Sequence, residues 1–392
     1  MPAERTGRAR NGNLRLFGVA HTVAATCLVL AFLVGGAQGL AVAALLGLLE
    51  VAVSFDNAIV NATVLARMAP FWQRMFYTVG ILVAAIGMRL LVPLGIVSVG
   101  AKLDPVSALR LAYRNPDRYH HLLLAAQPAI AAFGGAFLLM IFLGFVFEER
   151  DEVWIRWVEG PLRKLGRLPR IGEMCVLGFS IVAAATVRQE IAFKVMVGAV
   201  AGLLSYMLVD SVGQVIAREA DADGASRPRV TVVGRAAFFL FCYLELLDAT
   251  FSFDSVMGAF SVTLNLSLIT IGLAIGAAYI RALTVYVVRK GTLEEYRYLE
   301  HGAYYAIGML AVLLMVEVWR DVPDVLTAGA GAFLIVAAVA SSVRARGRQA
   351  RALRQAESGQ PVAEVRLVAN ARVMVGEVAE TKAKTRHNNP AA

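Results

Sequence analysis

Apolar runs recur along the chain from Leu16 to Val343, and short polar or charged segments separate them. Each run holds roughly 18 to 25 residues, and a helix rising about 1.5 Å per residue needs about 20 to cross a hydrocarbon core of roughly 30 Å. The pattern predicts ten spans, at about 16–36, 39–66, 76–99, 126–147, 172–187, 195–217, 236–260, 266–288, 302–319 and 323–343. The predicted fold class is therefore all-α, a polytopic membrane protein with about ten transmembrane helices.

The prediction of the fifth span, at 172–187, has the least support of the ten. Only about fifteen apolar residues separate Glu173 from Arg188, so this segment either crosses the membrane or re-enters on the side from which it came. This choice sets the direction in which every later span crosses.

Composition agrees with a membrane protein, because 58% of the 392 residues are hydrophobic, 17% are charged and the mean hydropathy is +0.64. The net charge of +9 comes from the two ends, since residues 1–15 carry four Arg against one Glu and residues 344–392 carry ten Lys or Arg against four Glu. The region between them is balanced, so this charge does not indicate nucleic-acid binding.

These features divide the chain into a basic amino terminus at 1–15, a transmembrane domain at 16–343 and a basic, partly disordered tail at 344–392. Lys and Arg are enriched in the connections that share a side with the termini, which predicts a multi-pass plasma-membrane protein with both termini in the cytoplasm. The charged loop 148–171 contains Trp154 and Trp157 and is expected to lie along the membrane interface.

An acidic motif occurs twice inside the apolar runs. Glu50-Val-Ala-Val-Ser-Phe-Asp56-Asn57 is followed 198 residues later by Asp248-Ala-Thr-Phe-Ser-Phe-Asp254-Ser255. Ionisable groups inside a membrane face protein or a watery cavity and pair with a partner, so the two motifs predict a functional site.

The repeat extends beyond the motif. Gly80 is followed nine residues later by Arg89, and Gly272 is followed nine residues later by Arg281. Two repeats of three helices, at about 39–147 and 236–319, explain this spacing. Four spans lie between the motif helices, so the repeats have inverted topology, as in many secondary transporters; if 172–187 does not cross, they are parallel.

Helical geometry places one polar stripe on the first motif helix, made of Glu50, Ser54, Asn57 and Asn61. Asp56 lies about 100° around the helix from Asn57. In the second motif four residues share a polar face, and Asp254 points about opposite to Glu245, the first of them. That face consists of Glu245, Asp248, Ser252 and Ser255. The motif carboxylates can therefore meet only if both helices break at Ser-Phe-Asp. We expect these breaks, because Ser, Asp and Asn side chains compete for backbone hydrogen bonds and cap helix starts. The alternative is a straight helix whose polar stripe packs against another.

The candidate metal ligands all donate oxygen, which suits hard divalent ions such as manganese, magnesium or calcium. They are Glu50, Asp56, Asn57, Glu245, Asp248, Asp254 and Ser255. Arg89 and Arg281 lie well inside their spans and are expected to pair with the motif carboxylates when no metal is bound, unless a tilted helix brings them to the interface. Cys27, Cys175 and Cys242 show no metal-ligand spacing and are expected to pack against neighbouring helices.

Over residues 39–340, the forms Glu-x-x-x-Ser-x-Asp-Asn and Glu-x-x-Asp-x-x-Phe-Ser-x-Asp-Ser resemble the TerC integral membrane family, which is associated with tellurium resistance, and in particular its uncharacterised actinobacterial-type branch. That family belongs to the lysine-exporter superfamily of inverted-repeat transporters. The resemblance implies export of a divalent metal, with manganese as the first candidate, and places the seven candidate ligands at the family's acidic motif positions. The metal is then a substrate, and no cofactor is expected.

The leading hypothesis is a secondary active exporter that exchanges a divalent metal for protons, since the sequence contains no P-loop. The alternatives are a transporter of calcium or another small solute, and a membrane scaffold that recruits cytoplasmic metal-stress proteins through the 148–171 loop and the tail. An enzyme is not expected, because no nucleophile–base pair or catalytic metal triad is visible.

Overall fold

The computed structural model describes residues 3–148, 150, 152–222, 234–320 and 322–357. The chain divides into two compact units, residues 1–338 and 339–392, and the first of these contains both acidic motifs. Every regular element in the described ranges is a helix, so the predicted all-α fold class is confirmed. Of the predicted tail, residues 358–392 lie outside the described residues.

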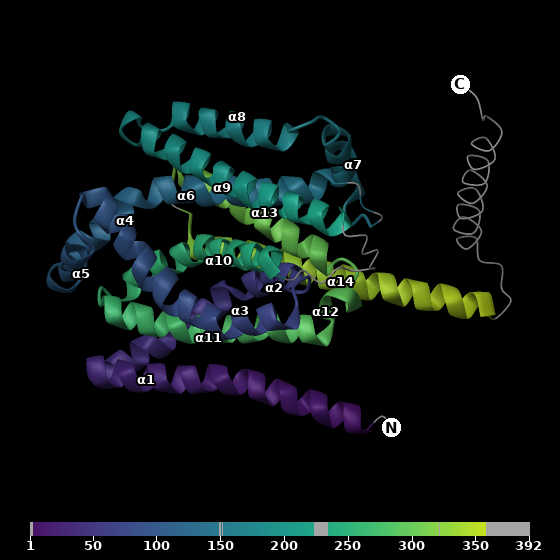
Figure 1. Ribbon diagram of the computed structural model, residues 1–392, viewed down its shortest axis with the longest axis horizontal. Helices are drawn as coiled ribbons and strands as arrows, with labels where there is room; N and C mark the ends of the chain where they lie inside the picture. The colour runs from purple at the N-terminus through teal and green to yellow at the C-terminus, as the bar shows by residue number, and fades with distance from the viewer. Residues whose placement is uncertain (1–2, 149, 151, 223–233, 321, 358–392) are drawn as a thin grey trace. The chain divides into compact units, whose positions relative to one another are not determined.

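Fourteen α-helices and one π-helix make up the described chain (Figure 1). They are α1 (Ala3–Val53), α2 (Phe55–Leu65), α3 (Pro70–Leu82), the π-helix Val83–Leu91, α4 (Val92–Ala101), α5 (Pro105–Arg114), α6 (Pro116–Phe147), α7 (Arg156–Leu165), α8 (Ile171–Thr186), α9 (Gln189–Ala222), α10 (Gly234–Val262), α11 (Leu266–Lys290), α12 (Thr292–Glu295), α13 (Leu299–Glu317) and α14 (Asp324–Glu357). Within the described ranges, eight helices are long and apolar enough to cross a membrane. The protein is therefore a multi-pass membrane protein.

Helix α1 contains the first predicted span and the beginning of the second, because it reverses direction at Gly35 and Gly36. Gly36 has φ 60° and ψ −149°, a conformation that only glycine adopts readily. A Cβ placed on Gly39 would lie 2.5 Å from the carbonyl oxygen of Ala31, whereas eight residues of a straight helix would separate them by about 12 Å. The spans predicted at 16–36 and 39–66 are thus separate arms.

Polar contacts define the two ends of the bundle. At one end, called the Arg67 end, Glu300 Oε1 accepts hydrogen bonds from Arg67 at 3.4 Å and from Arg150 at 3.1 Å. At the opposite end, called the Tyr113 end, the hydroxyls of Tyr113 and Ser267 lie 2.9 Å apart. The second arm of α1 and α2 lead to the Arg67 end, whereas α10 leads to the Tyr113 end, where α11 begins.

The short helix α8 crosses from one end to the other. Gly172, at its start, faces Met140 and Leu143 near the end of α6. Thr186, at its finish, accepts a 2.9 Å hydrogen bond from the indole of Trp319, just beyond α13. The helix therefore does not re-enter, and the two repeats run in opposite directions as predicted for an inverted-repeat fold.

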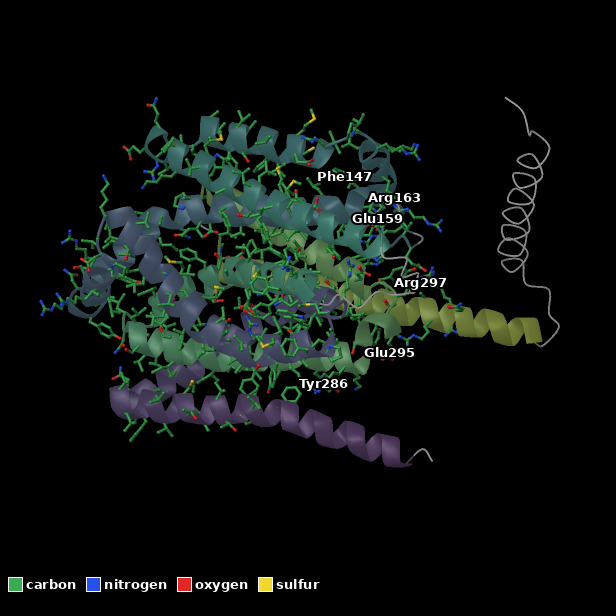
Figure 2. All side chains as sticks on the ribbon, viewed as in Figure 1. Phe147, Glu159, Arg163, Tyr286, Glu295 and Arg297 are labelled. Atoms are coloured by element: carbon green, nitrogen blue, oxygen red, sulfur yellow. The ribbon has the colours of Figure 1, made fainter. Side chains whose placement is uncertain are left out.

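The loop predicted to lie at the interface contains α7, at the Arg67 end. Glu159 is buried and accepts the backbone N–H groups of Trp154 and Ile155 at 3.1 and 3.0 Å, and it pairs with Arg163 at 3.6 Å. Figure 2 shows Glu159 and Arg163 beside the end of α6 at Phe147. These contacts fix α7 while leaving Trp157 81% exposed, which suits a residue at the membrane surface.

The two repeats interlock through glycines on α1 and α11. A Cβ on Gly47 would lie 3.0 Å from Ile275, and one on Gly272 would lie 2.7 Å from the Leu46 side chain. One on Gly276 would overlap the side-chain carbons of Glu50. Small residues let transmembrane helices approach closely in this way, so the first motif is held directly against a helix of the second repeat.

We predict that Gly276→Ala destabilises the protein by about 1–3 kcal/mol, because the added methyl group must displace the buried Glu50 side chain. Thermal unfolding of the purified protein measures the effect. Gly178→Ala, on α8, is the matched control, since a Cβ there meets no atom within 4 Å. Equal unfolding temperatures for the two variants would contradict the predicted close packing.

Candidate functional site

The first motif helix breaks where the sequence predicted. Helix α1 ends at Val53, α2 begins at Phe55, and Ser54 between them has φ −96° and ψ 14°. The Ser54 hydroxyl donates to Glu50 Oε1 at 3.2 Å and does not cap α2. The break therefore turns Asp56 and Asn57 relative to Glu50 without freeing the Ser54 N–H, which still donates to the Glu50 carbonyl at 2.9 Å.

The second motif helix does not break, so this part of the prediction was wrong. Helix α10 continues through Ser252 and Asp254 to Val262. Three of its polar side chains find partners without unwinding, since Glu245 and Asp248 bind Arg281 and the Thr250 hydroxyl donates to the Leu246 carbonyl. Packing and these bonds outweigh the weak local preference of one Ser and one Asp for a helix end.

A cavity of about 220 Å³ nevertheless brings the motifs together. Five of the seven candidate ligands line it: Glu50, Asp56, Asn57, Asp254 and Ser255. Asp254 reaches the cavity from a straight helix because it lies on the same face as Phe251, Ser255 and Gly258, at helical spacing. The site therefore needs one break and not two.

A second, smaller cavity of about 10 Å³ adjoins the first. The two share Glu50, Asn57 and Phe251. Polar groups from both repeats line the small cavity: Glu50, Ser54, Asn57, Arg89, Asp248, Ser252 and Arg281. Its volume suits about one water molecule. Two buried oxygens there, Glu50 Oε2 and Ser252 Oγ, have no hydrogen-bond partner.

Arg281 is held in a charged clamp. Its two terminal nitrogens donate to the two carboxylate oxygens of Glu245 at 2.9 and 2.8 Å, and one of them also donates to Asp248 at 2.9 Å. The guanidinium lies 4.3 Å from the centre of the Phe76 ring and donates to the Phe76 carbonyl at 3.1 Å. Bidentate and cation–π contacts of this kind are the preferred environment of a buried arginine.

Arg89 makes the corresponding pair in the first repeat. It donates to Glu50 Oε1 at 2.5 Å and to the Ala84 carbonyl at 2.7 Å. Arg89 lies in the π-helix Val83–Leu91, a local geometry often found at functional sites. The side chains of Arg89 and Arg281 are only 3% and 2% exposed, so the predicted ion pairs are present and neither arginine reaches the interface.

The remaining candidates lie around this core. Glu245 lines neither cavity, because Arg281 binds both of its oxygens. Asn61 also lines neither cavity, although it is buried and neither atom of its amide has a partner. Within the described ranges, no three His, Cys, Asp or Glu side chains converge as a metal site would require. The seven candidate ligands do not surround one point.

Helices α13 and α14 add residues that the motifs did not indicate. Leu310 and Thr327 line the large cavity, and Gly331 abuts the Asp56 carboxylate. Helix α14 lies outside both repeats, so the internal repetition contained no signal for it. The cysteine prediction also needs correction, since Cys175 and Cys242 are exposed on the helical surface and do not pack in the core.

We predict that Arg281→Met lowers the free energy of unfolding by about 3–5 kcal/mol, because it leaves the buried Glu245 and the partly buried Asp248 without a counter-ion. Adding Glu245→Gln and Asp248→Asn in the same chain should recover much of this loss. Arg297→Met is the control for an exposed ion pair, with Glu152, and should cost about 0–1 kcal/mol. Chemical unfolding of the purified variants tests this, and equal losses for the two arginines would contradict the clamp.

A family model described as "Protein of unknown function (DUF475)" matches residues 55–349. The match runs from the start of α2 into α14 and so includes Asp56, the whole second repeat and both arginines. No curated protein and no solved structure matches the chain. The description does not bear on the resemblance to TerC proteins, which stays a prediction. Because this family model covers well over half of the 392 residues, the chain belongs to the DUF475 family.

Proposed function

We propose that this protein is a secondary active transporter that exports a divalent metal ion, with manganese as the first candidate, across the plasma membrane. One observation carries the proposal: the cavity between two opposed repeats is lined by three carboxylates, those of Glu50, Asp56 and Asp254. Transporters with inverted repeats bind their substrates where the repeats meet. Carboxylates retained inside a membrane mark ion pathways.

The arginines act as internal counter-ions in this proposal. Glu50 has one oxygen bound to Arg89 and one without a partner, and it lines both cavities. A divalent cation in the large cavity can therefore interact with Glu50 Oε2 before the arginine pair is disturbed. Further movement of Glu50 toward the cation requires it to leave Arg89, which links ion binding to a change in the packing of the first repeat.

The size of the large cavity bears on how a metal would be held. At about 30 Å³ per water molecule, 220 Å³ has room for a cation together with several waters. Hard divalent ions such as magnesium keep part of their hydration shell in proteins. The separation of the acidic groups in this structure is thus compatible with a cation that enters partly hydrated.

Exchange for protons is the proposed energy source. The carboxylates that attract the metal ion can also bind a proton. The same groups can therefore bind the metal ion and the proton alternately, while the two ions cross the membrane in opposite directions. The chain contains no P-loop that would bind ATP, which supports transport driven by an ion gradient.

A small organic cation is a second candidate substrate, and the cavity lining favours it. Apolar groups make up much of that lining: Leu46, Leu49, Val53, Phe251, Ala259, Val262, Leu273 and Leu310. The clamp around Arg281 shows that the neighbouring carboxylates hold a guanidinium group well. An ammonium or guanidinium compound would place its charge near Asp56 and Asp254 and its alkyl part against the apolar wall.

We predict that the double variant Asp56→Asn/Asp254→Asn reduces manganese flux into proteoliposomes at least tenfold, because both amides have lost the charge that attracts the ion. Asp104→Asn is the control: Asp104 caps α5 through the Ser107 N–H, outside the cavity, and hydrogen bonds from Ser107 lower its pKa. Asparagine is an equally good cap, so this variant should transport as wild type does. Undiminished flux in the double variant would rule out the acidic cavity as the pathway.

The class of substrate can be determined by measuring which ions stabilise the folded protein. A ligand that binds only the folded state raises its stability, by about 2.7 kcal/mol at a concentration of 100 times its dissociation constant. We expect manganese to raise the unfolding temperature of the wild-type protein and to have little effect on the double variant. Stabilisation by guanidinium or alkylammonium ions at low millimolar concentration, with none by manganese, would favour the organic cation.

A further inference from the structure

Helix α14 reaches the acidic cavity although it belongs to neither repeat. Thr327 lines the large cavity together with Asp56 and Asp254. One turn later, Gly331 lies against the Asp56 carboxylate. Farther along, Ala338 packs against Gly302 of α13. The helix therefore contacts the motif helix of one repeat and the third helix of the other.

The close approach at Gly331 depends on the absence of a side chain. A Cβ there would overlap Asp56 Oδ2 and would lie 3.0 Å from the Asp56 carboxyl carbon. On the same helix, a Cβ on Gly329 would meet no atom within 4 Å. The contact is thus specific to position 331.

The two faces of α14 differ. Thr327 and Gly331 are four residues apart and lie on one face of the helix. Leu326 and Phe333 are 55% and 70% exposed and share another face at a spacing of seven residues. An apolar face this exposed suits lipid, whereas the face with Thr327 and Gly331 meets the cavity.

We propose that α14 is a wall of the cation cavity, in which Thr327 contacts the transported ion and Gly331 is the positioning residue that lets the helix backbone set the orientation of Asp56. The oxygen of a threonine hydroxyl can be a ligand of a hard cation. It can also form a hydrogen bond with a water molecule that the cation has bound. The inference rests on the proposed function in taking a cation as the cargo. It adds α14 to a site to which, by the repeats alone, only the two motif helices would contribute.

Thiol labelling tests the wall without relying on transport. In a chain with Cys27, Cys175 and Cys242 replaced by alanine, Thr327→Cys is exposed in proteoliposomes to a cationic, membrane-impermeant methanethiosulfonate on both sides. Phe333→Cys is the matched control on the face that meets lipid. We expect the thiol at position 327 to react at least tenfold faster than the thiol at 333, and manganese to slow it.

Each outcome bears on the proposal. Equal, slow reaction at the two positions would overturn the wall. Fast reaction at 327 with manganese protection supports both the wall and the metal cargo. Fast reaction that manganese leaves unchanged supports the wall and contradicts metal as the cargo, so failure of the proposed function can be told apart from failure of the inference.

The role of Gly331 is tested by comparing Gly331→Ala with Gly329→Ala. We expect Gly331→Ala to reduce manganese-dependent stabilisation and flux at least tenfold, while it elutes as a folded protein in size-exclusion chromatography. Gly329→Ala should behave as wild type. Identical ion responses in the two variants would overturn the positioning role. If Gly331→Ala does not fold, the labelling experiment decides the placement of α14.

Discussion

Two arginines buried inside the membrane-spanning bundle control the arrangement of this site. Each carries a charge that a low-dielectric environment opposes strongly unless an anion lies beside it. Arg89 meets that requirement with Glu50, and Arg281 meets it with Glu245 and Asp248. In each repeat the pair joins the motif helix to the helix that follows, so the position of the acidic groups is tied to the position of the arginine.

Close packing then brings the two pairs to one place. Gly272 and Gly276 of α11 allow the second arm of α1 to lie directly against the second repeat, with Glu50 over Gly276. Glu50 consequently pairs with its own arginine and also lines both cavities. In the proposed transporter, a carboxylate in this position would respond both to a cation in the cavity and to the repeat in which it lies, which is the coupling that alternating access requires.

Much of the fold follows from the apolar pattern, because run length alone identifies segments that can cross a membrane. The same spacing between glycine and arginine occurs in both repeats, at Gly80 and Arg89 and at Gly272 and Arg281. It correctly indicated two buried arginines with acidic partners. Periodicity did not show that α10 stays straight through Asp254, since its stability depends on the Arg281 clamp, a contact between residues 33 and 36 positions apart. Nor did it indicate Thr327, which reaches the cavity by tertiary packing, or Gly331, which lies against Asp56. Both resemble ordinary residues of an apolar helix.

The proposed transporter binds a cation in the cavity that Asp56 and Asp254 line. The most direct measurement is a structure of the purified protein with bound manganese, in which anomalous scattering at the manganese absorption edge locates the ion. We expect an anomalous peak inside the cavity, within direct or water-mediated reach of Asp56, Asp254 and Glu50 Oε2. A peak on the protein surface alone, or none at manganese concentrations that support transport, would contradict it.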